Sequence, residues 1–310
     1  MNGPPQDDTP PYGIIAQMLS AGQVVPFLGA GASAVYRPAD AGKWKSGKDD
    51  FLPFGSELAH RLARDAAYPE EPDTVSDLAL VASYYEHVGG DRPSLNFALR
   101  QAFSGAYRPG AIHALLARVE QPLLIVTTNY DDLLEQAFSE RDYHLVVDRG
   151  DKSRVWVAGG HGLEPVRTSN LREALLPADR AIIYKLHGTF DRENTVNDHF
   201  LVTEQDYVDF LGRAQTCVPP YLATRMAQAR FLFLGYSLAD WNVRVMLRKL
   251  RQPAKTQDDQ LRSWAIHKNP GQAERKIWEA HKVNIYDLDL KAFGRELAQE
   301  LGLDPDELAN

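Results

Sequence analysis

The chain has 310 residues, 44% of them hydrophobic and 25% charged, which is typical of a globular protein and excludes a disordered one. Its formal net charge of -8 is spread along the sequence without a basic stripe, so we expect no direct binding of nucleic acid. Cys217 is the one cysteine, which excludes an internal disulfide and a zinc site made of four thiolates.

Residues 1–11 are polar and rich in proline, and we expect them to form a flexible arm. They lack the basic start and apolar stretch of a targeting sequence. No apolar run approaches the roughly 20 residues that cross a bilayer, so the sequence predicts a cytoplasmic protein that does not bind membranes. Residues 12–310 are expected to form one domain, with a loose tail after Leu303.

Short apolar runs bounded by turn residues predict strands that are buried on both faces, as in parallel sheets. The runs are Val24–Leu28, Leu123–Thr127, Ala181–Leu186, Phe231–Leu234, Ser263–Ile266 and Val283–Tyr286. Helical patterns separate most of them, at Tyr12–Ser20, Ile112–Val119, Asp131–Phe138, Trp241–Leu250, Gln272–His281 and Leu290–Leu301. This alternation predicts an α/β fold, a Rossmann-like doubly wound sheet with mostly parallel strands.

Two inserts interrupt the alternation. The first, at about 36–108, separates the first two strands and is too long for a structureless loop. Helical periodicity recurs within it, at Ser56–Ala67, Thr74–His87 and Arg92–Phe103. We therefore expect a helical insert that forms a lid or subdomain over the edge of the sheet. The second, at about 140–180, is irregular, with an extra pair of strands predicted at Tyr143–Val147 and Arg154–Val157.

The first predicted strand leads into a glycine-rich turn from Gly29 to Ser33. Its glycines let the backbone turn sharply and approach a ligand closely, with amide N–H groups facing a diphosphate. The third glycine of the dinucleotide fingerprint is missing, however, and a strand-to-helix turn can use glycine merely to turn. Both interpretations stay open at this point.

Polar residues follow three further predicted strands. They are Thr127, Thr128, Asn129 and Asp131 after the second strand, His187 after the third, and Ser237 and Asp240 after the fourth. Asn129, Asp131, Ser237 or Asp240 could simply cap the next helix, and His187 could be a core histidine. Because ligands of open α/β sheets bind at the carboxyl ends of strands, the joint placement of these residues favours one binding crevice.

In this order and spacing, five segments resemble the sirtuin superfamily. They are Phe27–Ser33, Pro109–Val119 with His113, Thr127–Asp131, Lys185–Gly188 and Gly235–Asp240. More narrowly, they resemble the bacterial sirtuin-like NADase domains of anti-phage defence systems. The resemblance covers the expected sheet core, about residues 12–35 and 109–290.

The resemblance implies a role for each matched residue, with NAD as the substrate. Gly29, Ala30, Gly31 and Ser33 would hold the diphosphate, while Asn129 and Asp131 would line the pocket for nicotinamide and its ribose. His187 would be the general base. Gly235 and Ser237 would contact the phosphate and adenosine side, and Asp287 would approach the adenine.

Two features depart from the family pattern. Sirtuin deacylases carry a zinc ribbon on four cysteines beside the acyl-lysine cleft, and this chain has one cysteine, so we expect no metal and no deacylase cleft. Residues Ala34–Asp40 lack the proline-aspartate-phenylalanine-arginine signature, with Arg37 as the nearest counterpart. Lys43, Trp44 and Lys45 could form a mobile loop over the pocket, but we favour a solvated loop.

Cleavage of the nicotinamide–ribose bond passes through an oxocarbenium-like state, for which positioning, charge stabilisation and a base suffice. Asn129 can hold a water or a ribose hydroxyl, and His187 can take a proton near neutral pH. The sequence therefore predicts a NAD+ hydrolase that forms ADP-ribose and nicotinamide and depletes NAD in anti-phage defence. A non-catalytic module that binds NAD or ADP-ribose and a zinc-free protein deacylase remain as alternatives.

The resemblance also implies regulation, because depletion of NAD is toxic to the cell. In the defence proteins the trigger is a partner or an additional domain. This chain ends soon after the expected core, so we expect a separately encoded partner, with a hexameric HerA-type ATPase as the candidate. We also expect a homo-oligomer.

Overall fold

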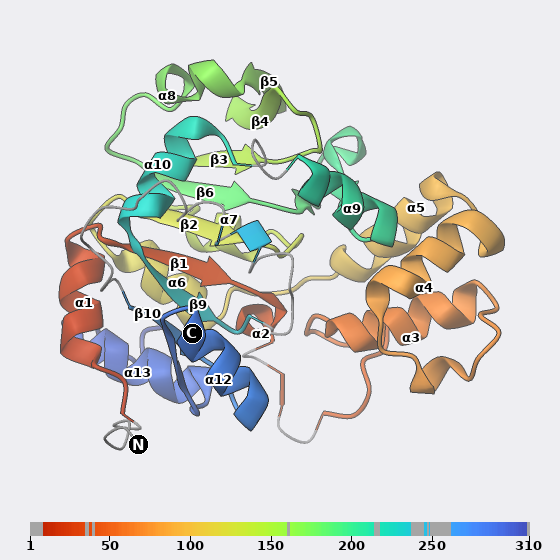
Figure 1. Cartoon of the computed structure of the whole chain (residues 1–310), viewed down its shortest axis with the longest axis horizontal. Helices are drawn as coiled ribbons and strands as arrows, with labels where there is room; N and C mark the ends of the chain where they lie inside the picture. The colour runs from red at the N-terminus through yellow and green to blue at the C-terminus, as the bar shows by residue number, and fades with distance from the viewer. Residues whose placement is uncertain are drawn as a thin grey trace.

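A nine-stranded sheet runs through the centre of the described part of the chain (Figure 1). The computed structural model describes residues 9–34, 37–38, 41–159, 162–213, 218–236, 245–246, 248 and 262–308. The strand order is β11-β10-β9-β1-β2-β6-β3-β4-β5. From β11 to β3 the neighbouring strands are parallel, whereas β4 and β5 are antiparallel. The mostly parallel sheet predicted from the sequence is thus confirmed.

The strand bounds follow the predicted apolar runs closely. They are β1 (Val24–Leu28), β2 (Leu124–Thr127), β3 (Tyr143–Val147), β4 (Arg154–Gly159), β5 (Gly162–Arg167), β6 (Ala181–Lys185), β9 (Arg230–Leu234), β10 (Ser263–Ile266) and β11 (Val283–Tyr286). Strand β5 was not predicted, because it is an exposed edge strand that contains Pro165 and has no apolar run. Proline and charged residues on an edge strand disfavour pairing with another chain.

Helices cover both faces of the sheet, as a doubly wound fold requires (Figure 1). They are α1 (Tyr12–Ser20), α6 (Ala111–Arg118), α7 (Leu133–Ala137), α8 (Leu171–Ala174), α9 (Glu204–Gly212), α10 (Pro220–Gln228), α12 (Gln272–Ala280) and α13 (Leu290–Glu300). Along β1, Val24 and Leu28 pack with α1, α6 and α13, whereas Val25 and Phe27 pack on the opposite face with α10 and α12. The helix expected at 241–250 lies almost entirely outside the described residues.

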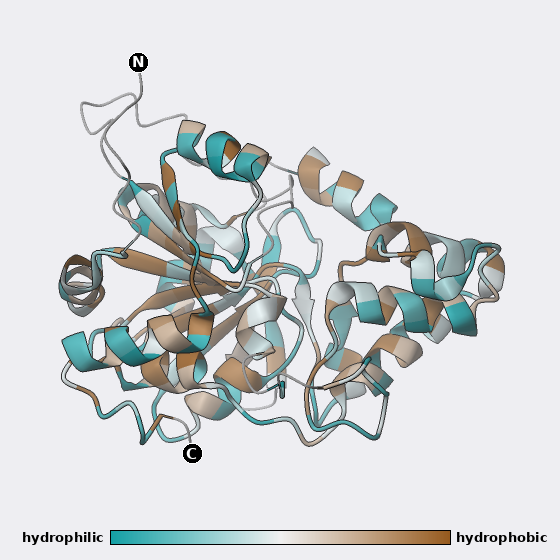
Figure 2. Cartoon of the chain, turned by 90° about the horizontal axis from the view of Figure 1, so that it is seen from below, coloured by the Kyte–Doolittle hydropathy of each residue, from teal (hydrophilic) through white to brown (hydrophobic). Residues whose placement is uncertain are grey.

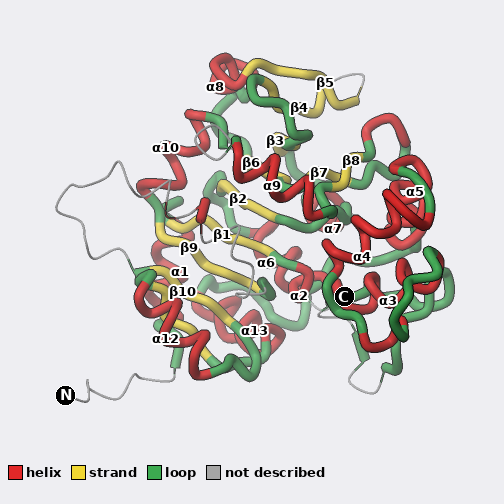
Figure 3. The backbone as a smooth tube through the Cα atoms, turned by 45° about the vertical axis from the view of Figure 1, so that its right-hand side comes forward, coloured by secondary structure: helices red, strands yellow, loops and turns green. Residues whose placement is uncertain are grey.

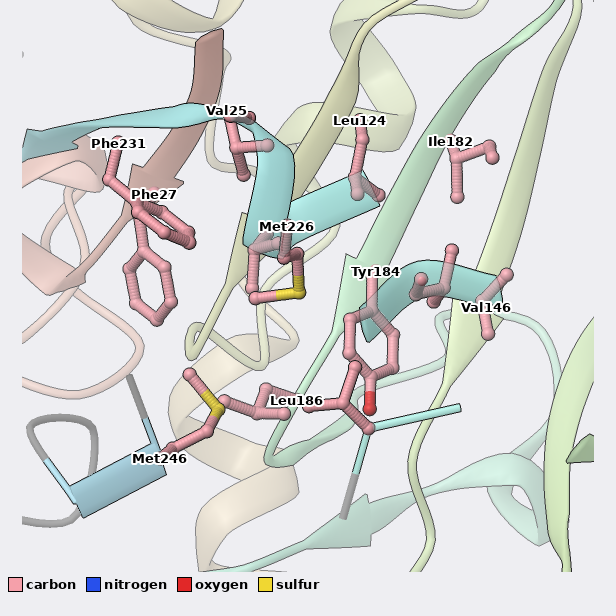
Figure 4. Close-up of a cluster of buried hydrophobic side chains, with 14 of the residues drawn as sticks. Val25, Phe27, Leu124, Val146, Ile182, Tyr184, Leu186, Met226, Phe231 and Met246 are labelled. Atoms are coloured by element: carbon pink, nitrogen blue, oxygen red, sulfur yellow. The ribbon is translucent and has the colours of Figure 1, made fainter. Parts of the chain in front are cut away.

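The core on the second face is close-packed from side chains of several strands and helices. Figure 4 shows Phe27, Phe231, Tyr184 and Met226 within this cluster, and all four are fully buried. Each fully buried side chain of this size stabilises the fold by about 2 kcal/mol relative to exposure. Hydrophobic colours run along the strands between the helices in Figure 2. This packing holds the carboxyl ends of the strands in a fixed arrangement.

The insert between β1 and β2 is helical and lies beside the carboxyl edge of the sheet (Figures 1 and 3). It contains α3 (Gly55–Asp65), α4 (Leu78–Tyr84), a π-helical turn (Tyr85–Gly89) and α5 (Arg92–Phe103). Its own apolar core includes Leu62 and Leu99, and it continues into Tyr130 and Phe200 of the sheet domain. Ring contacts of Phe103 with Tyr130 and Phe200, at 5.6 and 6.1 Å between centroids, fasten the insert to the sheet domain.

The expectation of a loose tail after Leu303 is wrong. Leu308 is 3% exposed and packs in the cluster of α1, α6 and α13. Arg118 of α6 also forms an ion pair with Glu307 at 2.9 Å.

Within the part of the chain that the structure describes, no helix is both long enough and apolar enough to span a membrane.

Candidate functional site

A cleft of about 1090 Å³ lies at the carboxyl ends of the parallel strands. Residues that follow six strands line it, namely Gly29, Ala30, Gly31 and Ser33 after β1, Asn129 and Asp131 after β2, His187 after β6, Gly235 after β9, His267 and Lys268 after β10, and Leu288 and Asp289 after β11. Strands β2, β6 and β3 lie on one side of β1, and β9, β10 and β11 on the other. Open α/β sheets bind ligands at this point of reversal.

The glycines after β1 allow a close approach to the turn after β9. The short helix α2 (Ala30–Ser33) begins here, and a Cβ on Gly31 would lie 2.7 Å from the carbonyl oxygen of Gly235. The amide N–H of Gly31 donates to that oxygen at 2.8 Å, and the N–H of Gly29 donates to Leu234 O at 3.1 Å. These two amides therefore bind β9 rather than facing the cleft, so the turn-forming interpretation of the glycines holds for them.

Asn129 is held in one orientation beside this turn. Its Nδ2 lies 3.0 Å from Gly29 O and 3.0 Å from Ser33 Oγ. Because a backbone carbonyl can only accept a hydrogen bond, the atom facing Gly29 must be the amide nitrogen. Both N–H bonds of the amide are thereby used, and no described residue forms a hydrogen bond with Oδ1. In the side chain of Asn129, which lines the cleft, the carbonyl oxygen is thus the atom left to accept a hydrogen bond from a ligand.

Ser33 and Asp131 complete the chain of hydrogen bonds. Ser33 Oγ accepts from Asn129 and donates to Asp131 Oδ2 at 2.9 Å. The other oxygen of Asp131 accepts from the N–H of Leu133, the first residue of α7, at 3.2 Å, although the N-cap residue itself is Asp132. Asp131 therefore lines the cleft and also binds an N–H at the start of the helix. Ser33 and Asp131 are only 8% and 7% exposed, so their hydrogen bonds orient Asn129 in a largely water-free environment.

His187 lies where β6 ends and lines the same cleft as Asn129. Its ring packs edge-on against Tyr207 and Phe210 of α9, at 5.6 Å between centroids in each case. The residue is only 3% exposed, so it lines the cleft from a largely buried position. The next residue, Gly188, has φ +92°, and a Cβ there would lie 2.1 Å from His199 O. The sharp turn at Gly188 is thus possible only for glycine.

The wall opposite the sheet comes from the insert. Arg37 lines the cleft, and its guanidinium group makes two hydrogen bonds to Glu57 of α3, at 2.6 and 2.7 Å. The same group stacks on Phe51 and Phe54 at 4.8 and 5.0 Å. Burial alone would raise the pKa of Glu57, but the hydrogen bonds from Arg37 and from backbone amides outweigh it and lower the pKa. Sequence reasoning found Arg37 but not Glu57.

The expectation of a solvated loop at Lys43, Trp44 and Lys45 is wrong for its central residue. Trp44 is 7% exposed and packs in the apolar core of the insert. The backbone N–H of Trp44 donates to Glu57 Oε1 at 2.9 Å, so the segment is fixed to the helix whose Glu57 also binds Arg37. The flanking lysines are exposed, and Lys43 pairs with Asp73 at 2.8 Å on the surface.

The far end of the cleft contains residues that sequence reasoning missed. His267 and Lys268 follow β10, and Asp289 follows β11. Among the described residues, His267 Nδ1 has no hydrogen-bond partner although it is buried. Asp287, predicted to approach the adenine, instead binds Arg275 and the N–H of Asn269 and does not line the cleft. A polar residue directly after a buried strand was the signal available for His267.

Two residues of the predicted site, Ser237 and Asp240, lie outside the described residues. Cys217, the one cysteine, also lies outside them. Among the residues that are described, no group of three or more His, Cys, Asp or Glu side chains lies close enough together to hold a metal ion.

Behind His187, the two-stranded pair β7 (Gly188–Thr189) and β8 (His199–Phe200) carries a second histidine. Burial first, and then the guanidinium groups of Arg149 and Arg92, lower the pKa of His199 to about 4. Arg213 lowers the pKa of His199 further, while the carboxylate of Asp206 opposes the shift. His199 is therefore neutral in the folded protein at pH 5, where it is protonated in the unfolded chain.

Acidification is expected to weaken the fold through His199. Because its folded pKa is the lower one, its contribution to stability is complete above about pH 6.5 and is lost as the pH falls toward 4. The loss at pH 5.0 is about 2 kcal/mol. Urea unfolding at pH 7.5 and 5.0 measures how far the free energy of unfolding falls on acidification. This fall should be about 2 kcal/mol smaller in His199→Gln than in the wild type. In His87→Gln, which changes an exposed histidine, the loss should be unaltered; an unaltered loss in His199→Gln would contradict the assignment.

Comparison with known proteins agrees with this geometry. The chain matches the SIR2-like domain over residues 123–286, just over half of its length. It is 25% identical over 260 residues to a protein named NAD(+) hydrolase ThsA from Acinetobacter baumannii (strain 532279), which covers 84% of this chain and 45% of that protein. A protein of the same name from Enterococcus faecium is 27% identical over 197 residues, covering 63% of this chain and 36% of the other.

A third relative carries a different name. Defense-associated sirtuin 2 of Bacillus subtilis is 25% identical over 134 residues, covering 43% of this chain and 11% of that protein. The chain therefore spans less than half the length of these curated relatives. The matched segment, residues 123–286, begins at β2, ends with β11 and includes both Asn129 and His187. On the strength of this match, the chain belongs to the SIR2-like family.

Proposed function

We propose that the chain is a NAD+ hydrolase that converts NAD to ADP-ribose and nicotinamide and acts in anti-phage defence. The observation that carries the proposal is the meeting of Asn129 and His187 in one cleft beside the turn at 29–33. Two relatives named NAD(+) hydrolase ThsA and one named defense-associated sirtuin support it. NAD is the substrate in this account, and no metal takes part in it.

The orientation of Asn129 suits the step in which the glycosidic bond breaks. Its Oδ1 can accept a hydrogen bond from a water or a ribose hydroxyl, and His187 can take the proton that is released. Water adds to the anomeric carbon, and the bonding electrons leave with the nicotinamide nitrogen, which becomes neutral. The products are ADP-ribose, nicotinamide and one proton. The fixed dipole of Asn129 needs no reorganisation during this step.

We place the adenosine half of NAD at the far end of the cleft. His267 offers a ring nitrogen there, and Lys268 and Lys291, which line the same cleft, offer positive charge to a bound dinucleotide. Lys268 Nζ lies 3.5 Å from Asp289 Oδ2, so Asp289 restrains this lysine. A cleft of about 1090 Å³ is slightly larger than the usual cofactor site, so it has room for a whole dinucleotide.

Asp131→Asn is expected to lower kcat by up to about 100-fold with little change in KM. An amide at 131 that still accepts from the N–H of Leu133 turns its NH2 group toward Ser33 Oγ. The Ser33 hydroxyl then loses the acceptor that fixes its hydrogen, so it no longer holds the Asn129 amide in one orientation. Steady-state kinetics of nicotinamide release measures the change.

Asp132→Asn is the matched control for this variant, because it alters the adjacent carboxylate. Asp132 binds Arg192 at 2.9 Å and does not line the cleft. Its kcat should stay within about threefold of the wild type. Equal losses in the two variants would show that the orientation of Asn129 does not depend on Asp131.

The proposed function is tested by incubating the purified chain with NAD and following nicotinamide and ADP-ribose by chromatography. Release of both products in equal amounts is the expected result. Binding of NAD without any product, in the presence and absence of the partner, would instead support a non-catalytic binding module. Release of nicotinamide only in the presence of an acylated peptide would support a deacylase.

We further propose that the enzyme is cytoplasmic, where it meets the cellular NAD, and that it forms a homo-oligomer. Because unrestricted hydrolysis would kill the cell, a partner protein is proposed to control it, with a HerA-type ATPase as the candidate. Light scattering and activity measurements on the purified chain test the assembly and the control by a partner. A monomer that is fully active on its own would contradict both of these proposals.

A further inference from the structure

A lysine is completely buried directly below the cleft. Lys185 is the last residue of β6, and it is 0% exposed. Its ammonium group donates to the carbonyl oxygens of Tyr130 and Asp131, at 3.2 and 2.6 Å, and to Glu135 Oε1 at 2.6 Å. Three acceptors thus use all three of its N–H bonds. The site described above gives this residue no part in binding or chemistry.

The position of Lys185 connects the two halves of the site. It precedes His187 by two residues on the same strand end, and the two carbonyls that it holds belong to the residues directly after Asn129. The backbone hydrogen bonds from Leu186 N to Thr127 O and from Phe190 N to Tyr130 O lie on either side of this contact. Between those bonds, the Lys185 side chain joins the loop that carries Asn129 to the strand that carries His187.

Stability alone does not account for a buried ion pair here. A buried pair is often no more stabilising than apolar residues of similar volume. The second oxygen of Glu135, Oε2, is buried and has no hydrogen-bond partner among the described residues. Burial raises the pKa of the Glu135 carboxyl, while Lys185 opposes that shift. The pair therefore has an energetic cost that its contribution to stability does not explain.

We propose that Lys185 is a positioning residue that fixes the carbonyl oxygen of Asn129 relative to the imidazole of His187. It acts by holding the carbonyls of Tyr130 and Asp131, not by neutralising Glu135. The expected changes in kcat rest on the proposed function, whereas the expected changes in stability and in the NMR spectrum do not. Removing both charges should restore the stability of the protein but not its activity. Stability depends on the balance of the two charges, whereas activity depends on the donors of Lys185.

Two variants separate the alternatives. Lys185→Met removes the donors and leaves the largely buried Glu135 without its cation, so Tm should fall by roughly 10 °C. Its kcat should fall about 100-fold, with KM within about threefold of the wild type. The double variant Lys185→Met/Glu135→Leu removes both charges, so Tm should recover. Its kcat should stay low, because the carbonyls of Tyr130 and Asp131 still lack the Lys185 donor, even though that of Tyr130 keeps its bond from the N–H of Phe190. Recovery of kcat together with Tm would overturn the proposal.

A spectroscopic readout does not depend on turnover. The side-chain amide protons of Asn129 are hydrogen-bonded to Gly29 and Ser33, and their NMR cross-peaks are assigned as those missing from Asn129→Ala. They should shift in both Lys185 variants, and unshifted peaks would overturn the inference. If the wild type releases no nicotinamide, the proposed function fails, but this measurement still tests the positioning.

A conservative variant separates the loss of the hydrogen-bond donors from a loss of the fold. Lys185→Arg keeps the positive charge and the N–H donors, so kcat should fall less than tenfold even if Tm decreases. A loss of kcat as large as in Lys185→Met, at a temperature where circular dichroism shows both to be folded, would contradict the role assigned to the donors.

Discussion

Alanine at His187 or at Asn129 is expected to reduce kcat for NAD hydrolysis by at least about 100-fold in a protein that still folds. His187→Ala removes the base, and Asn129→Ala removes the acceptor that faces the cleft. Because the two residues act on one step, the double variant should be little worse than either single variant. Initial rates of nicotinamide release, with thermal unfolding measured in parallel, provide the test.

His87→Ala and Asn170→Ala are the matched controls, since both change exposed residues of the same types outside the cleft. Their kcat should equal that of the wild type. A His187→Ala variant with unchanged kcat would remove the imidazole from the mechanism and return it to the role of a buried packing residue.

Alanine at Gly235 is expected to destabilise the fold by about 4 kcal/mol or more. The residue has φ +60°, and a Cβ there would lie 2.1 Å from Ala32 N and 2.4 Å from Gly31 C. Both neighbours are backbone atoms of the turn after β1, so neither can rotate away. Urea unfolding measures the loss, and the turn that lines the cleft should be displaced in whatever protein remains folded.

Gly302→Ala provides the control for backbone strain. Gly302 has φ +71°, close to that of Gly235, but nothing lies within 4 Å of a Cβ built there. Its cost should be about 1 kcal/mol, that of a left-handed conformation alone. Equal costs for the two variants would show that close contact between the turns after β1 and β9 is not what requires glycine.

Buried parallel strands could be predicted well because their sequences are continuous apolar runs. The bounds of β1, β10 and β11 agree with the prediction at both ends, since each run is bounded by turn residues. The strands β5, β7 and β8 were missed because they are exposed or only two residues long, so they leave no periodic pattern. Helix α9 was missed as well, although Thr203 caps it with a capping box. That signal was present in the sequence.

The candidate site could be predicted in outline for a related reason. Carboxyl ends of parallel strands share one edge, so Asn129, His187 and the glycine turn had to come near one another once the strands were identified. Which atoms face the cleft depends on hydrogen bonds between residues about 100 positions apart, such as Ser33 with Asp131, and no local pattern reveals these. Glu57 was missed because its bonds to Arg37, which lines the cleft, depend on how the insert packs.

Lys185 illustrates the limit more sharply. A lysine at the end of an apolar run is most simply read as the point where a strand emerges into solvent. The structure instead buries it completely, and only the positions of Tyr130, Asp131 and Glu135 in space explain how its charge is accommodated.

The most direct test of the whole account is a crystal structure of the His187→Ala variant grown with NAD, in which the substrate should persist. The nicotinamide ribose is expected between Asn129 Oδ1 and the end of β6, the diphosphate along the turn at 29–33, and the adenosine toward His267. NAD bound in the reverse direction, or bound outside this cleft, would contradict it.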